Sequence, residues 1–154
     1  MTAPAGARPL NASHLAVGRM LLEGETPEGA ARRLSMFIGT VRRRLTEIGL
    51  RLGAATAVDR AVALLACGHL PPPQAGMRAP DLRPVDIAVL RVLTKLAPEV
   101  TLPEDLRYDD AFLTHVEELR VRCGARTDAH LAALAAAWNL LPGLVPQPTP
   151  GKEE

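Results

Sequence analysis

The chain has 154 residues, a length that fits one ordinary domain or two very small ones. Hydrophobic residues make up 47% of the chain and aromatic residues only 3%, so its core would consist of leucine, valine, isoleucine and alanine. Strands prefer aromatic and β-branched side chains, and this composition therefore favours small packed helices. A formal net charge of +1 gives the whole chain no strong electrostatic preference for any class of partner.

The cysteines and the N-terminus exclude several classes of protein. Cys67 and Cys123 are the only cysteines, and no CxxC motif or His/Cys cluster occurs, so we expect neither a disulfide framework nor a metal site. The N-terminal MTAPAGARPL lacks the apolar core of a signal peptide. No apolar run reaches the roughly 18 residues of a membrane-spanning helix. These features predict a cytoplasmic protein with no membrane association.

Prolines divide the chain into segments. A run of three prolines from Pro71 cannot continue a helix, and we expect a semi-rigid Pro-rich linker over residues 71–81. Residues 1–9 are predicted to be a flexible N-terminus, and residues 143–154, again rich in proline, a disordered tail. The folded segments that remain are residues 10–70 and 82–142.

The two folded segments repeat each other's sequence. LxxxxLAVxR at residues 10–19 corresponds to LxxxxIAVxR at 82–91, and GAAT at 53–56 corresponds to GART at 124–127. The matches keep the same order and nearly the same spacing. A repeat of about 70 residues is too long for a solenoid unit, so the sequence predicts two related small domains.

Capping signals and apolar periodicity predict four helices in the first segment. Asn11, Thr26 and Thr56 are expected to cap the first, second and fourth helices. The third is expected to span residues 38–52 and to end at Gly53. No segment alternates with a period of two for long enough to form a strand. The predicted fold class is therefore all-α.

The predicted helix over 38–52 is the most informative stretch of the chain. Its apolar stripe has the i, i+4, i+7, i+11 spacing of one helix face. The stripe consists of Val41, Leu45, Ile48 and Leu52. The run Arg42-Arg43-Arg44 falls off this stripe, and a helix that is apolar on one side and basic on the other suits a major groove. A solvated basic face is the alternative interpretation.

Short motifs in the first segment are similar to those of a known family. EG at 23–24, ARRL at 31–34 and GTVR at 39–42 stand in the order and at the spacing of the LuxR-type helix-turn-helix domain, which residues 10–70 resemble. The resemblance implies a bacterial DNA-binding protein that acts as a dimer and regulates transcription. It also implies that the third helix enters the major groove and that the fourth forms the dimer contact. The second segment is then a degenerate copy of the same four-helix fold.

The candidate DNA-binding residues surround the basic run. They are Thr40, Arg42, Arg43, Arg44, Thr46, Glu47, Arg32 and Arg33. A helical wheel places Arg43, Thr46 and Glu47 away from the apolar stripe, so we expect them to face base edges. The other candidates on this helix are expected to contact phosphates. For Arg32 and Arg33, which precede the turn, a phosphate contact and a solvated role both stay open.

An apolar tip departs from the family pattern at the start of the same helix. Phe37 and Ile38 stand where the family has polar residues. We interpret Met36-Phe37-Ile38 as packed under a neighbouring part of the chain, and the alternative is a contact with a partner. His14 stands at the position of a family glutamate in the first helix and is predicted to be structural.

The second segment keeps the apolar pattern but loses the basic surface. Residues 10–70 hold eight arginines against five acidic residues, whereas residues 81–142 hold seven basic against ten acidic residues. The helix that begins at Asp109 would be repelled by phosphate, so we do not expect this segment to bind DNA. Pro98 and Pro103 leave room for at most a turn or two of its second helix.

The last predicted helix of the second segment is a candidate interface. It is rich in alanine and contains Trp138, the only tryptophan of the chain. Small residues let helices approach closely, and a large aromatic can anchor an interface. A dimer interface, an interface within the chain and ordinary core packing all stay open for Trp138.

These patterns lead to two functional hypotheses. The first is a transcription regulator that binds double-stranded DNA through residues 38–52 and uses its second segment for dimerisation or partner binding. The second is an adaptor that binds a regulatory protein and no longer binds DNA. An enzyme is not expected, because the four histidines are scattered and no catalytic, metal-ligand or phosphate-loop spacing appears. No cofactor and no small-molecule ligand are expected either.

Overall fold

The computed structural model describes residues 9–107, 109–141 and 144. Within these residues every regular element is helical, which confirms the predicted all-α class, and no strand occurs. The α-helices are α1 (Ala12–Leu22), α2 (Pro27–Leu34), α3 (Ile38–Leu52), α4 (Ala57–Ala66), α5 (Pro84–Leu93), α6 (Asp109–Cys123) and α7 (Asp128–Ala137). Nearly all of the predicted flexible N-terminus and disordered tail lies outside the described residues.

The predicted caps start the helices of the first segment. The side chains of Asn11, Thr26 and Thr56 accept hydrogen bonds from backbone N–H groups in the first turns of α1, α2 and α4. Each cap satisfies one of the N–H groups that a helix start leaves without a partner. The bounds of α3 agree with the prediction, and Gly53 ends that helix in the left-handed conformation with a φ of 68°.

The second segment has a similar order of elements with a broken second helix. Two short 3₁₀ turns, η1 (Glu99–Thr101) and η2 (Glu104–Leu106), follow α5 and take the place of a second α-helix. Pro98 and Pro103 stand directly before these turns, where proline removes a hydrogen-bond donor and prevents a continuous helix. The prediction that only a turn or two would survive is confirmed.

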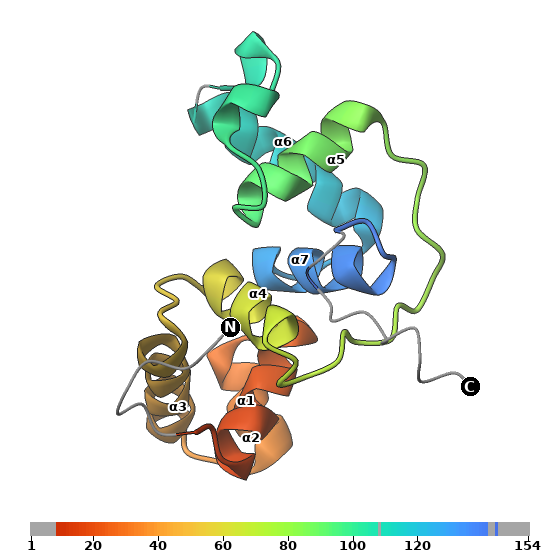
Figure 1. Cartoon of the computed structure of the whole chain (residues 1–154). Coiled ribbons are helices and arrows are strands. Elements are labelled where there is room, and N and C mark those ends of the chain that lie inside the picture. Colours follow the sequence, from red (N-terminus) through yellow and green to blue (C-terminus); the bar gives the residue numbers. More distant parts are fainter. Residues whose placement is uncertain (1–8, 108, 142–143, 145–154) are drawn as a thin grey trace, which may run out of the picture.

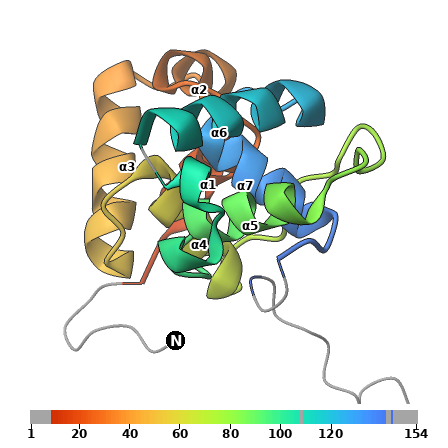
Figure 2. The same cartoon turned by 90° about the horizontal axis from the view of Figure 1, so that it is seen from above.

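The two segments pack on each other through α4 and α7. These helices form the most extensive contact between elements and lie one above the other in the middle of the molecule (Figure 1). Leu64 and Leu65 of α4 and Leu131 of α7 belong to one continuous hydrophobic core that also includes residues of α5 and α6. A smaller core beneath α2 and α3 contains Val17, Met20, Ala30 and Val41. Viewed from above, α3 lies at the outer edge of this arrangement (Figure 2).

Polar contacts also join the two segments. Asp59 of α4 lies 3.1 Å from Lys95, and Glu25 lies 3.4 Å from Arg126. Gly24 approaches His130 so closely that a Cβ atom at this position would stand 2.6 Å from the Nδ1 atom. Gly24 also has a φ of +83°, which glycine adopts without strain. A glycine is therefore required here both by the backbone and by the neighbouring segment.

In the part of the chain that the structure describes, every helix is too short or too polar to cross a membrane.

Candidate nucleic-acid interface

Helix α3 buries one face and presents the other to solvent. Val41 and Ile48 of the predicted apolar stripe are completely buried, and Leu45 and Leu52 are half-buried against the cores. Gly39, Arg43 and Thr46 lie on the outward face and are exposed. The separation of the two faces follows the 3.6-residue period of the sequence, which confirms the predicted orientation of the helix.

Arg43 points into solvent. It is exposed, and within the described residues it makes no hydrogen bond or ion pair. Gly39 lies one turn earlier, and an added Cβ there would meet no atom within 4 Å. Thr46 lies on the same outward side, and its hydroxyl donates to the Arg42 carbonyl oxygen at 3.1 Å. This part of α3 is therefore open for the approach of a large partner.

Arg42 forms only a weak ion pair, with Glu28, that a phosphate could replace. Its Nη2 atom lies 3.2 Å from Oε2 of Glu28 in α2, and both side chains are more than half exposed. An exposed ion pair of this kind contributes little free energy, about 0–1 kcal/mol. Thr40 is half-buried in the first turn of α3. Arg42 can therefore exchange Glu28 for an anionic partner at small cost.

Arg44 and Glu47 point toward α1. Nε of Arg44 donates to Ser13 Oγ at 3.0 Å, and its Nη1 donates to Glu47 Oε1 at 3.0 Å. The same carboxylate oxygen lies 2.8 Å from Nε2 of the buried His14. The hydrogen bond from His14, followed by the one from Arg44, lowers the pKa of Glu47 and keeps it ionised.

The placement of Glu47 corrects the expectation that it would face base edges. Glu47 lies at the border of the buried face, where it accepts from His14 of α1 and from Arg44 of α3 itself, and the His14 contact holds α3 against α1. His14 is structural, as predicted: its Nδ1 accepts from the backbone N–H of Asn11 at 3.1 Å. The ring therefore carries its proton on Nε2, where it donates to Glu47.

The two arginines of α2 have different surroundings. Arg33 donates to Glu23 at 3.0 Å and to Glu25 at 2.9 Å, and these carboxylates raise its pKa. Arg32 is exposed, and the described residues provide it with no hydrogen bond or ion pair. Of the two, Arg32 is the one available to a phosphate.

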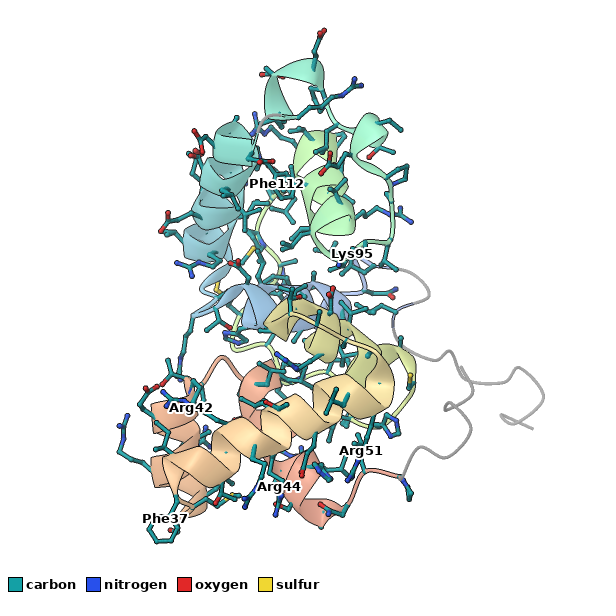
Figure 3. The ribbon with its side chains drawn as sticks, turned by 90° about the vertical axis from the view of Figure 1, so that its left-hand side faces the viewer. Phe37, Arg42, Arg44, Arg51, Lys95 and Phe112 are labelled. Carbon is teal, nitrogen blue, oxygen red and sulfur yellow. The ribbon has the colours of Figure 1, made fainter. Side chains whose placement is uncertain are left out.

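Phe37 contradicts the interpretation of the apolar tip as packed. Its side chain is 87% exposed and projects from the first turn of α3 (Figure 3). Met36 and Ile38 are half-buried, and Met36 packs against the smaller core. Phe37 is also the N-cap residue of α3 and provides no side-chain hydrogen bond to the helix start. The turn directs its two neighbours inward, and no element among the described residues covers Phe37.

Sequence reasoning missed Leu50. It is 77% exposed and lies seven residues after Arg43, on the same outward face of α3. The sequence does contain the signal: Leu50 lies off the apolar stripe of this helix, so the pattern does not place it in the core. The candidate interface therefore has an apolar residue at each end, Phe37 and Leu50, and exposed arginines between them.

Trp138 is used within the chain. Its indole nitrogen donates to the Met77 carbonyl oxygen at 3.1 Å, which ties the end of α7 to the Pro-rich linker. The ring packs against the main core and is half-buried. Both contacts lie within the chain, and they agree with core packing as well as with an interface within the chain.

The second segment has a contact between α5 and α6 that corresponds to the α1–α3 contact. Here the acid lies on the first helix and the histidine on the later one. Asp86 of α5 is completely buried and accepts from His115 of α6 at 2.7 Å, from Arg122 at 3.3 Å and from the Arg83 backbone N–H at 2.8 Å. Burial acts to raise the pKa of Asp86, but these hydrogen bonds outweigh it and lower the pKa to about 2. The outward side of α6 carries Thr114, Glu117 and Glu118, all of them exposed and none basic.

The described residues contain no cluster of His, Cys, Asp or Glu side chains suited to a metal ion. Cys123 is buried, and burial raises the pKa of its thiol, which makes the thiol unreactive. The chain matches no family model, no curated protein and no solved structure.

Proposed function

We propose that the chain is a DNA-binding transcription regulator that reads the major groove with α3. The observation that carries this proposal is Arg43, an exposed guanidinium on the outward face of an otherwise well-packed helix. A long cation in this position can reach a guanine edge, whose O6 and N7 atoms accept two hydrogen bonds from arginine. The LuxR-type resemblance of residues 10–70 assigns the same helix to the groove.

The neighbours of Arg43 support the same partner. Arg42 and Arg32 are exposed cations that can contact phosphates on either side of the groove. The first turn of α3 has no side-chain cap, and Gly39 leaves open space in front of it, so backbone N–H groups can approach a phosphate. These contacts position the helix, and Arg43 and Thr46 supply the reading of bases.

We further propose that the chain consists of two tandem LuxR-type folds, the second degenerate and used for packing within the chain. The resemblance assigns the dimer contact to the fourth helix, α4, and in this molecule α7 lies on α4. The second segment then takes the place that a second subunit would occupy. A monomer with a single reading helix follows from this arrangement, and the mass in solution tests it.

The decisive experiment is selection of bound duplexes from a random pool, followed by titration of the enriched duplex. Wild-type protein is expected to enrich a motif, and Arg43→Glu is expected to lose binding because it places a carboxylate against the groove. Arg78→Glu is the matched control, since Arg78 is exposed in the linker and far along the chain from α3. Binding that survives Arg43→Glu, or is lost equally in Arg78→Glu, contradicts the proposal.

The exposure of Phe37 and Leu50 favours a second candidate function, an adaptor that binds a regulatory protein through the outward face of α3. Exposed apolar residues with arginines between them are also typical of protein interfaces. An enriched duplex motif would count against this candidate. A pool without enrichment, from protein that is folded by circular dichroism, would favour it.

A further inference from the structure

A cavity of about 600 Å³ opens between the two segments, beneath the buried side of α3. Its walls are mainly aliphatic, and the residues that form them include Val17, Ala30, Val41, Leu45, Val58 and Ala129. The volume lies in the range of pockets that hold small organic ligands, which are typically apolar with a few polar groups. The cavity could not be predicted from the sequence, because its walls come from both segments.

One arginine from each segment lines the cavity, Arg60 of α4 and Arg120 of α6. The Nε atom of each is buried and has no hydrogen-bond partner among the described residues. The carboxylates nearest to Arg120 lie at 3.6 and 3.9 Å, longer than a hydrogen bond. Among the described residues, neither guanidinium group therefore has a carboxylate within hydrogen-bond distance, and both can accept an anionic partner from the cavity.

Helix starts add to the preference for an anion. The first residues of α2, α4 and α7 all line the cavity, each beginning with a threonine cap: Thr26, Thr56 and Thr127. Each helix start carries a partial positive charge from its N–H groups. Three such starts and two guanidinium groups around one cavity favour negative charge inside it.

The carboxylates on the same walls do not cancel this preference. Glu25 accepts from Arg33 at 2.9 Å and from Arg126 at 3.4 Å, and the pKa of Glu25 is lowered, first by the Arg33 hydrogen bond. Its charge is thus already matched by two other arginines. Asp128 is 45% exposed at the start of α7 and lies too far from the Arg120 Nε atom to satisfy it.

We propose that this cavity binds a monocarboxylate with an apolar body, such as a medium-chain fatty acid. The carboxylate accepts from the guanidinium groups of Arg60 and Arg120, and the apolar body lies on the aliphatic walls.

An occupant would touch the buried side of α3. Val41 and Leu45 belong to both the cavity and α3, and the Arg60 guanidinium lies over Gly49, where an added Cβ would stand 2.8 Å from its Nε. Binding in the cavity does not depend on whether the protein binds DNA.

Calorimetric titration of the full chain with decanoate, decanol and acetate tests the proposal. Decanoate is expected to bind about tenfold more tightly than decanol, because only the acid supplies charged acceptors, and acetate is expected to show no binding. Arg60→Met and Arg120→Met should each reduce or abolish this preference for the acid. Arg78→Met, which removes an exposed arginine of the linker, should keep it.

A second variant fixes the location. Ala57 is exposed at the mouth of the cavity, so Ala57→Trp should fold normally and weaken both decanoate and decanol. Equal affinity for acid and alcohol, retention of the preference in both arginine variants, or unchanged binding in Ala57→Trp would each overturn the proposal. The proposal would also be overturned if folded wild-type protein bound no decanoate, because the cavity would then contain only water.

Discussion

Nε2 of His14 lies 2.8 Å from Oε1 of Glu47, so a buried histidine of α1 contacts α3 at the border of its buried face. The second segment joins its corresponding helices with the charges exchanged, since the acid is Asp86 on α5 and the histidine is His115 on α6. Each pair links a first helix to a third helix and fixes the rotation of the latter about its own axis. In the first segment this rotation directs Arg43 outward.

Glu47→Gln is expected to reduce stability and to leave DNA specificity unchanged. The variant weakens the hydrogen bonds with His14 and Arg44, and the His14 contact holds α3 against α1. The midpoint of urea unfolding should fall, whereas the duplex motif selected from a random pool should stay the same. Thr46→Ala is the control, since Thr46 is exposed and its loss should alter the motif more than the stability. If Glu47→Gln changed the selected motif, the result would show that Glu47 contacts base edges and would contradict its assignment to the α1–α3 contact.

Arg42→Gln is expected to weaken DNA binding for all sequences equally. Removal of one phosphate contact reduces the slope of log affinity against log salt by about 0.9. Fluorescence anisotropy titrations with the selected duplex at several salt concentrations measure this slope. Arg33→Gln serves as the comparison, because Arg33 is already paired with Glu23 and Glu25 and should change the slope less. Equal changes in the two variants would contradict the assigned roles.

Asp86 is expected to make stability depend on acidity below about pH 4. Its pKa of about 2 in the folded chain lies below the ordinary 3.8, so its contribution is complete above about pH 4 and is lost as the pH falls toward 2. The size of the pKa shift corresponds to about 2 kcal/mol. Asp86→Asn should remove this contribution at neutral pH and flatten the dependence of unfolding free energy on pH between 4 and 2.

Urea unfolding across that pH range measures the effect. The exposed Asp105 provides the control, because Asp105→Asn should leave both the stability and its pH dependence close to wild type. If Asp86→Asn kept the wild-type pH dependence, the acid sensitivity would have to come from other carboxylates.

Phe37→Ser is expected to stabilise the chain by about 1 kcal/mol. The phenyl ring is 87% exposed and contributes little packing, and serine at this position can cap α3. Phe37→Ala separates the two effects, since alanine removes the ring without providing a cap. Thermal unfolding should therefore rank the serine variant above both alanine and wild type. A loss of several kcal/mol in both variants would instead show that the ring is buried in solution.

Gly24→Ala is expected to destabilise the contact between the two segments. The variant adds the strain of a φ of +83° and a Cβ only 2.6 Å from His130. Gly53→Ala is a matched control, because Gly53 has a φ of +68° but open space around it. We expect a loss of about 1 kcal/mol for Gly53→Ala from the backbone alone. Gly24→Ala should cost at least about 1 kcal/mol more from the clash.

Chemical denaturation of the two glycine variants provides the comparison. Equal losses at both positions would mean that His130 moves away freely, and that the packing of α7 against the first segment is looser than the structure indicates.

The elements of this fold could be predicted because their causes lie within a few residues. Threonine caps, a glycine at the end of α3 and the apolar period of 3.6 residues are local signals, and they placed α3 at Ile38–Leu52. The same signals identified Arg43 as outward. Proline chemistry, equally local, accounts for the loss of the second helix before α6.

The surroundings of side chains at the border between the buried and exposed faces of a helix, or at its start, could not be predicted from such local signals. Glu47 stands between the buried and exposed faces, and a wheel cannot tell which neighbour will offer it a partner. The position of α1, with His14 and Ser13 directed at α3, made that decision. Phe37 was misjudged for the same reason, because whether a tip is covered depends on elements distant in sequence.

The sequence by itself determined the helices, their caps, the basic outward side of α3 and the acidic character of the second segment, because each depends on the order of neighbouring residues. Only the tertiary structure decided that α7 covers α4, that Trp138 holds the linker, and that Arg60 and Arg120 meet one cavity. These features require residues far apart in the chain to come together. Long-range packing creates them, and no local pattern records which surfaces will meet.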